Sequence, residues 1–400
     1  MNRFIKYYLI FLPIFSLFGI LASISRTVYQ DSYVLEFLII SAILDFMIIA
    51  LGFKYTLTKQ ITILLCLLFV STIVGLLNNE VSRRFVTDFT TPFFFFAKVF
   101  VFARYWDYTS FKDYIRFYTR FSFWGSLALL PVTYFIFNST GTTRLAIFPP
   151  MELPFSNYML SSSLMLLASF IIILLYGKRA QLFSAVITFV LYISVFRRKD
   201  LFKYIIILGI ASAILIPVFI KNSDNIAIRR LTATFDSYSG KGTDKENLDR
   251  ISAGRFNEFE TIINQMKPQD YFLGKGLGFT YDVDTGGKDS VETANAHFSP
   301  IGFLSKYGIF FTLFVYYFIM SIFFKSNKVL LSDSDYLIAL GVSIFIFMES
   351  FFAYALFVTP ILPIVLGVLI SNQKKQRKAA ILKRRNRVLV QQPQPGQVAF

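Results

Sequence analysis

The stretch ETANAHFSPIGFLSKYGIFF, residues 292–311, joins a polar segment to an apolar one, and His297, the only histidine of the chain, stands at the junction. Residues 298–324 are almost wholly apolar. A helix across a bilayer needs about 20 apolar residues, so this run is long enough to span one. Residues 221–297, which precede it, are rich in charge instead. The fold class therefore depends on whether similar apolar runs recur.

Apolar runs of this kind recur along the whole chain. Hydrophobic residues make up 55% and charged residues 16% of the 400 residues, and the mean hydropathy is +0.57. A water-soluble fold cannot bury so much apolar surface, so the composition predicts an all-α, polytopic membrane bundle. The runs that could form spans are 4–24, 33–53, 61–77, 85–103, 121–137, 158–176, 181–196, 204–220, 298–324 and the double-length run 336–370, with a turn near Tyr354.

Positive charge assigns these runs to the two sides of the membrane. The tail 371–400 carries eight Lys/Arg and no acid, and such basic flanks lie on the cytoplasmic side, facing anionic lipid. Nucleic acid is the less favoured partner for the same tail, and we expect none. Counting back from the tail places 221–297 outside, as one large loop between membrane helices in 1–220 and 298–370.

Counting forward from an N-terminus on the inside places the same loop inside, because an even number of runs, eight, precede it. The four positive charges of FRRKDLFK, residues 196–203, also favour the inside for their own segment. We therefore expect one further span between residues 139 and 180, at the proline-rich stretch RLAIFPPMELPFSNYML, residues 144–160. The total is then about eleven to twelve spans.

The outer segment contains one predicted helix and one predicted turn. Ser252 is a suitable N-cap and Pro268 a suitable stop for a helix over 252–267. The apolar side chains on one face of that helix are Phe256, Phe259, Ile263 and Met266. The glycines of GKGLG, residues 274–278, favour a tight turn that holds two segments together over a phosphate-binding loop.

Arginines gather on the predicted outer side, near the single histidine. They are Arg144, Arg179, Arg229, Arg230, Arg250 and Arg255. The planar guanidinium group matches the oxygens of a diphosphate. The competing interpretation pairs each arginine with one of the twelve acids of the segment 221–297. The arginines and His297 together form the candidate site. A neutral imidazole there could accept a proton near pH 7.

Several other chemistries lack the residues they need. The chain has a single cysteine, Cys66, so an internal disulfide is excluded. One cysteine and one histidine are too few to form a zinc site, so we expect no metal. Acids within the apolar runs need buried partners and could belong to a transporter, although structural hydrogen bonding explains them equally well. These acids are Glu36, Asp45, Asp88 and Glu349.

The order of short motifs resembles the O-antigen polymerase and O-antigen ligase superfamily of bacterial inner-membrane glycosyltransferases. GKRAQ opens one run and RRK lies between two others; RRL, SAGR, GKGLG and AHFSPIGFLSKYGI then follow along the outer segment. Residue-level similarity covers residues 179 to 309, and the similarity in hydropathy covers the whole chain.

This resemblance implies a multi-pass bundle with a large periplasmic loop and glycan transfer from an undecaprenyl-diphosphate carrier, without metal or other cofactor. It implies that Arg179 and Arg255 contact the diphosphate and that His297 serves the reaction. Two positions depart from the family pattern. Lys178 replaces the usual serine before the first arginine, and Phe298 follows the histidine where a polar residue is common.

The favoured function is therefore polymerisation of lipid-linked oligosaccharide repeat units for O-antigen, capsule or exopolysaccharide. The nearest alternative is a ligase that transfers finished glycan to a lipid A-core acceptor. A lipid-linked glycan flippase or transporter is less favoured, because it needs no long outer loop with a histidine at its end. The expected partners are the undecaprenyl-diphosphate-linked oligosaccharide, the lipid bilayer, a chain-length regulator and a flippase.

The predicted sidedness can be measured by labelling cysteine in intact cells. Cys66 is replaced by serine, and Ser237→Cys places one thiol in the segment 221–297. A membrane-impermeant maleimide should label this thiol without disruption of the inner membrane, since the basic tail assigns the loop to the outer side. Labelling that appears only after the inner membrane is broken would overturn the assignment.

Overall fold

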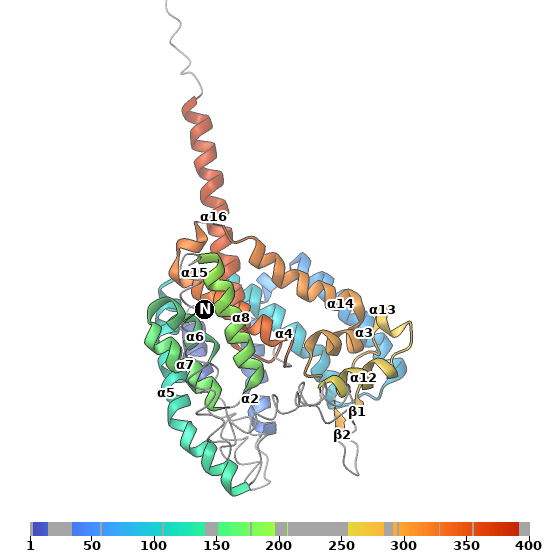
Figure 1. The fold of residues 1–400 in the computed structure, drawn as a ribbon. Helices are drawn as coiled ribbons and strands as arrows, with labels where there is room; N and C mark the ends of the chain where they lie inside the picture. The colour runs from blue at the N-terminus through green and yellow to red at the C-terminus, as the bar shows by residue number, and fades with distance from the viewer. Residues whose placement is uncertain are drawn as a thin grey trace, which may run out of the picture.

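The structure is a computed structural model, and helices form nearly all of the part it describes (Figure 1). The described residues are 3–14, 34–56, 58–105, 108–140, 151–176, 178–196, 206, 255–283, 291–293, 296–327, 329–353 and 356–391. Within them the strands are confined to one antiparallel pair, β1–β2. The all-α class is confirmed.

Where the structure describes them, most of the predicted apolar runs are helical; residues 15–24 of the first run, and the run 204–220 apart from residue 206, lie outside the described residues. After a helix over residues 3–14 come α2 (Val34–Thr56), α3 (Lys59–Asn78), α4 (Arg83–Tyr105), α5 (Tyr108–Thr140), α6 (Glu152–Ser161), α7 (Ser163–Leu175) and α8 (Arg179–Phe196). The second part contains α12 (Arg255–Gln265), α13 (Asp270–Leu273), β1 (Tyr281–Val283), β2 (Val291–Thr293), α14 (Ser299–Phe324), the short 3-10 helix η3 (Leu330–Ser332), α15 (Ser334–Glu349) and α16 (Ile361–Gln391). The run 336–370 thus divides into two helices, as predicted.

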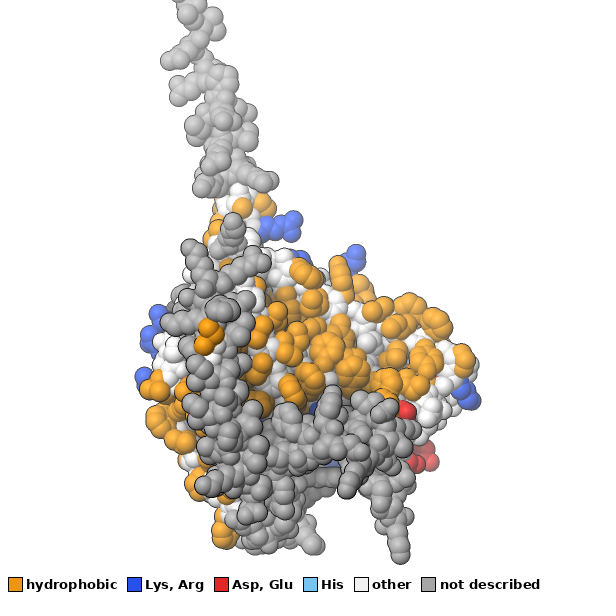
Figure 2. Space-filling view, in the orientation of Figure 1, with side chains coloured by type: hydrophobic (Ala, Val, Ile, Leu, Met, Phe, Trp, Pro, Cys, Tyr) orange, Lys and Arg blue, Asp and Glu red, His pale blue; other side chains and the backbone are white. Residues whose placement is uncertain are grey.

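Three helices, α3, α4 and α14, are long and apolar enough to cross a membrane by length and composition. Large hydrophobic side chains on α3 and α14 face outward: Leu77 is 80% exposed and Tyr317 is 74% exposed. Figure 2 shows hydrophobic side chains gathered over these two helices. Water would oppose such exposure, whereas lipid favours it, so the chain is a membrane protein by these criteria.

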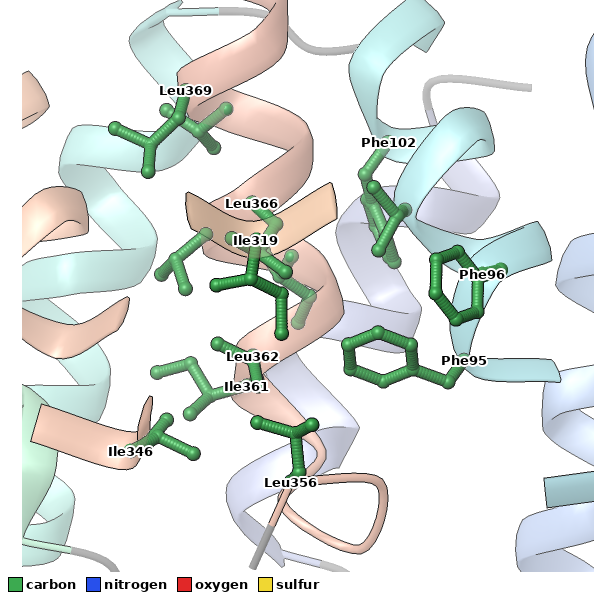
Figure 3. Close-up of a cluster of buried hydrophobic side chains, with 14 of the residues drawn as sticks. Phe95, Phe96, Phe102, Ile319, Ile346, Leu356, Ile361, Leu362, Leu366 and Leu369 are labelled. Carbon is green, nitrogen blue, oxygen red and sulfur yellow. The ribbon is translucent and has the colours of Figure 1, made fainter. Parts of the chain in front are cut away.

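The core of the bundle lies where α4 packs against α16. Phe95, Phe96 and Phe102 of α4 are buried and face the leucines of α16, including Leu362 and Leu366 (Figure 3). Gly367 of α16 lies directly against α4, because a Cβ there would come within 3.0 Å of the Phe102 Cβ and the Ala103 backbone nitrogen. The absence of a side chain therefore lets the two helices approach closely.

A buried carboxylate joins three parts of this bundle. Asp88 of α4 accepts hydrogen bonds from Lys306 Nζ of α14 at 2.6 Å and from the Gly278 backbone N–H at 3.0 Å. The Tyr307 hydroxyl donates to the Asp88 backbone oxygen at 2.8 Å. Asp88 and Lys306 are both buried. We call this set of contacts the Asp88 anchor.

The GKGLG turn lies between α3 and α14, as the predicted tight turn that holds two segments together. Its Lys275 and Gly276 N–H groups donate to carbonyls of residues 305 and 306, at 2.7 and 3.0 Å, and Asn79 donates to the Lys275 and Leu277 oxygens. Gly274 and Gly276 have φ of 75° and 89°, a left-handed conformation that favours glycine. The prediction of a structural turn is confirmed.

Two of the four acids predicted within the apolar runs, Asp45 and Asp88, have partners on other segments. Asp45 of α2 accepts from Lys98 Nζ at 2.6 Å and from the Tyr8 hydroxyl at 3.0 Å. Asp88 and Lys98 both lie on α4, but they do not pair with each other: Asp88 pairs with Lys306 and Lys98 with Asp45. The Glu36 side chain lies outside the part of the chain for which side chains are described. For Asp45 and Asp88, structural hydrogen bonding accounts for the charge in the bundle.

The predicted span 158–176 is wrong, and no further span lies beside it in the described residues 151–176, which form a helical hairpin instead. Its arms α6 and α7 have 10 and 13 residues, roughly 15 and 20 Å at 1.5 Å per residue, against about 30 Å of hydrocarbon. Met151 and Tyr176, at its two ends, both contact Ser126 of α5. Phe155 and Phe170 stack edge to face between the arms, with ring centroids 4.9 Å apart. The hairpin returns to the level at which it begins.

The two ends of the bundle can be distinguished by their contacts. At the loop end, residues 79–82, the GKGLG turn and the start of α14 lie together. At the tail end, Gln373 of α16 donates to the Ile322 oxygen at 2.8 Å, and Gln376 exchanges hydrogen bonds with Asn327. Segments that the charge pattern assigned to one side thus gather at one end.

The Asp88 anchor generates a stability prediction. Asp88→Asn removes the charge that pairs with buried Lys306, and breaking a buried ion pair from one side costs about 3–5 kcal/mol. We expect a lower thermal unfolding midpoint for the purified protein, and partial recovery in the double variant Asp88→Asn/Lys306→Met. The control Asp282→Asn changes an exposed carboxylate of β1 and should have little effect. An unchanged midpoint in the single variant would contradict the anchor's role.

Candidate functional site

The described part of the segment 221–297 packs as a small unit on the start of α14. An apolar cluster joins α12, the hairpin strand β1 and α14; it consists of Ile262, Met266, Phe279, Tyr281, Ala296 and Ile301. Strand pairing sets Tyr281 opposite Thr293. This cluster places one face of α12 beside His297, which lies two residues before α14 begins.

The predicted loop helix is present, but its buried face differs from the prediction. Helix α12 begins at Arg255 and ends before Pro268, while Ser252 lies outside the described residues. Glu258 and Ile262 are the buried residues, whereas Phe259 is 38% exposed. Met266 and Ile263 of the predicted face do pack in the apolar cluster, but beside them the buried position is held by a carboxylate that has partners of its own.

Glu258 is the central acceptor of the site. Its Oε1 accepts from the Tyr281 hydroxyl at 2.6 Å, and its Oε2 accepts from the His297 backbone N–H at 3.1 Å. The His297 Nδ1 lies 3.1 Å from Oε2 and 3.3 Å from Oε1. The Glu258 side chain is 6% exposed and that of His297 is 60% exposed. A buried carboxylate thus holds a histidine that faces outward.

The charge of Glu258 fixes the orientation of the imidazole proton. Burial alone would raise the pKa of Glu258, but hydrogen bonds from His297 and Tyr281, with the nearby histidine, hold it below its usual value. Burial and the contact with Glu258 also raise the pKa of Tyr281, so its hydroxyl stays protonated and donates. The ionised carboxylate requires a proton on Nδ1 of His297, which leaves Nε2 as the basic nitrogen of the neutral ring.

Two arginines are near enough for the positive charge of one to affect the other. Arg255 stands one turn before Glu258 on α12, and Arg179 opens α8. Burial and the positive charge of Arg179 lower the pKa of Arg255, while the carboxylate of Glu258 opposes that effect. Two neighbouring guanidinium groups that repel each other are stabilised by an anion that bridges them.

The polar region continues inward from Arg179. Gln181, two residues along α8, donates from Nε2 to Glu152 Oε1 at 3.3 Å, and Glu349 at the end of α15 lies beside both. All three side chains are buried. Glu152 Oε2 and Gln181 Oε1 have no hydrogen-bond partner among the described residues. Buried acceptors of this kind are suited to a donor group such as a hydroxyl.

The end of α15 is joined to the start of α14, next to His297. The Ser299 N–H donates to the Ser350 oxygen at 3.0 Å, and the Ser299 hydroxyl donates to the Ala353 oxygen at 3.1 Å. Phe298, which departs from the family pattern, faces the ring of Phe351 with centroids 6.1 Å apart. An aromatic contact therefore explains the apolar residue after the histidine.

The structure brings three of the predicted site residues to one end of the bundle: Arg179, Arg255 and His297. Arg144, Arg229, Arg230 and Arg250 lie outside the described residues. Glu258 and Tyr281 were not predicted. The spacing of Glu258 from Arg255, three residues on one helical face, was the available signal. It is weak, because charged pairs at this spacing are common on solvent-facing helices.

No family model, curated protein or solved structure matches this chain. Across the described residues, no group of three His, Cys, Asp or Glu side chains is placed to hold a metal ion. Residue chemistry and geometry therefore carry the interpretation.

The lowered pKa of Glu258 predicts how its contribution to stability depends on pH. A carboxylate with a depressed folded-state pKa stabilises the fold above its unfolded value, 4.5, and loses that contribution as pH falls through the folded value. The difference in unfolding midpoint between the chain and Glu258→Gln should be largest near neutral pH and shrink below pH 4.5. A difference that stays constant through that range would contradict the assignment, and Asp282→Asn serves as control.

Proposed function

We propose that this chain is a polymerase of undecaprenyl-diphosphate-linked oligosaccharide repeat units, working at the periplasmic face of the bacterial inner membrane. One observation carries the proposal: a buried carboxylate orients an exposed histidine beside two neighbouring arginines, at the loop end of an apolar helical bundle. The proposal fits the family resemblance of the sequence, which concerns the same three residues.

Glycosyl transfer from a diphosphate carrier needs few catalytic groups. The acceptor sugar hydroxyl attacks the anomeric carbon of the donor glycan as the bond from that carbon to the diphosphate oxygen breaks. The electron pair of the broken bond leaves with the undecaprenyl diphosphate. His297 Nε2 takes the proton of the attacking hydroxyl, and Glu258 stabilises the imidazolium that results. The proton then passes to water, which restores the neutral ring.

The arginines provide the second requirement, which is to stabilise the departing diphosphate. Negative charge grows on its oxygens as the bond breaks, and cationic donors that are already in place cost no reorganisation at that moment. The guanidinium groups of Arg255 and Arg179 are suited to this task because both are partly desolvated and the charge of Arg179 acts on Arg255. An anion between them would also relieve their mutual repulsion.

The proposed topology is a multi-pass bundle with a large periplasmic loop. It is supported by the hairpin of α6 and α7. A segment that returns to its starting level does not cross the membrane, so the chain leaves the hairpin on the side on which it entered. With α5 ending outside, α8 then leads inward, the basic segment FRRKDLFK lies inside, and one more span leads out to the loop. The count from the N-terminus and the count from the basic tail then both place the loop outside. An additional span between residues 139 and 180 would have had the same effect.

A single experiment tests the proposal and distinguishes it from the ligase alternative. A strain deleted for this chain should display single repeat units on its lipid core if the chain is a polymerase. Polymer retained on undecaprenyl diphosphate would indicate a ligase instead. Wild-type levels of surface glycan in the deletion strain would overturn both.

Complementation of that strain with variants tests the site itself. His297→Ala should remove long polymer, because general-base help is worth roughly 10²–10⁴-fold in rate. Glu258→Gln should lower activity less, since a neutral amide still accepts a hydrogen bond but stabilises the imidazolium poorly. Arg255→Lys keeps the charge but loses the planar fork, so most activity should be lost. Glycan length is measured on a gel and protein level on a blot.

Matched variants on the same elements keep this test specific. Asn264→Ala lies on an exposed position of α12 and Asp282→Asn on an exposed position of β1, and both should polymerise normally. Full-length polymer from a well-expressed His297→Ala protein would make the histidine a structural residue of the loop.

A further inference from the structure

A cavity of about 730 Å³ opens at the tail end of the bundle, opposite the candidate site. It lies between the start of α3, the end of α14 and the middle of α16. Nothing in the proposed glycosyl transfer uses this cavity.

The lining of the cavity divides into an apolar part and a basic part. Phe100, Phe318 and Ile322 are buried in the helical bundle and form the inner wall. Lys325, Lys374 and Arg377 are exposed and form the outer part. No acid is among the described residues that line it. Figure 2 shows Lys and Arg side chains beside the point where α16 projects from the body.

The polar side chains between these two parts are held by hydrogen bonds of their own. Gln373 donates to the Ile322 oxygen and to the Tyr336 hydroxyl, at 2.8 and 2.9 Å. Gln376 and Asn327 exchange two hydrogen bonds, at 2.7 and 2.9 Å. These contacts tie α16 to the end of α14, so the cavity has walls fixed independently of any ligand.

We propose that this cavity binds an anionic phospholipid of the bilayer, with its phosphate at Lys325, Lys374 and Arg377 and the upper part of an acyl chain against the phenylalanines. Charge complementarity carries the choice of an anion, since three cations and no acid are among the described residues that line the cavity. The apolar inner wall carries the choice of a lipid over a free phosphate, because a small anion would leave that wall without a partner.

The position of the cavity agrees with such an occupant. The outward-facing apolar side chains of α14 continue to Phe324, which is 79% exposed, and Lys325 follows immediately. A helix that changes from apolar to basic at its end places that end at the headgroup level of a membrane. The cavity therefore opens where lipid phosphates lie.

The test compares two lipids on the full chain by native mass spectrometry. The purified protein is titrated with dioleoyl phosphatidylglycerol or dioleoyl phosphatidylcholine, and retained lipid is counted. The phosphatidylglycerol should be retained more strongly by the native chain. A cation near a phosphate is worth roughly fivefold in affinity, so Lys325→Gln/Arg377→Gln should weaken binding about 25-fold.

The chain offers a control that matches the charge change. Lys375→Gln/Lys378→Gln removes two exposed charges of the same helix that do not line the cavity, and should keep the preference. Unfolding midpoints of all variants show whether a loss reflects the site or the fold. Lys374→Gln alone supplies a milder variant if the double variant unfolds.

Three outcomes would overturn the proposal. One is equal retention of the two lipids by the native chain. Another is the same loss of binding in the control as in the cavity variant. The third is displacement of bound lipid by glycerol phosphate at millimolar concentration, which would show that a free phosphate suffices and that the apolar wall plays no part.

Discussion

A charge inside an apolar bundle must be paired, and the pair between Asp88 and Lys306 is the interaction on which the rest of this structure depends. Each ion alone would cost several kcal/mol to bury, so the two helices can associate only in the arrangement that joins them. The same carboxylate also accepts from Gly278, which fixes the loop against α4. Because His297 lies nine residues before Lys306, this contact sets where the candidate site can lie.

The glycines near this pair let the loop pack closely against α14. Gly308 interrupts α14 with φ of 78°, and a Cβ there would come within 2.1 Å of the Phe272 oxygen of α13. A Cβ at Gly274 would meet the Lys306 oxygen at 2.3 Å in the same way. Backbone packs directly on backbone, so the loop has little freedom to shift relative to α14, which begins two residues after His297.

Length and hydropathy predicted most of the helices, because a span must be long and apolar whatever its neighbours are. They failed for α6 and α7, since two short apolar helices joined at Ser162 look like one span with a proline-rich approach. They also failed for Glu258, whose role depends on the fold around it. In sequence it is one acid among twelve in the outer segment; only the packing of β1 and α14 on α12 gives it Tyr281 and His297 as partners. The periodicity of apolar residues predicts which helix face is buried, but it cannot predict a buried carboxylate that is fully hydrogen-bonded.

Helix α14 connects the two ends of the molecule. It begins just after His297 and ends just before Lys325, and its 26 residues cover roughly 39 Å at 1.5 Å per residue, enough to cross the hydrocarbon. Between these ends it is held by Lys306 to α4 and interrupted at Gly308, so the part that carries the histidine is fixed separately from the part that reaches the basic cavity. The histidine and its carboxylate are therefore positioned by contacts at the loop end, which include Lys306 with Asp88 and Ser299 with the end of α15. For the glycosyl transfer proposed above, this separation would keep the reacting groups fixed at the surface where a polar glycan and its lipid carrier meet.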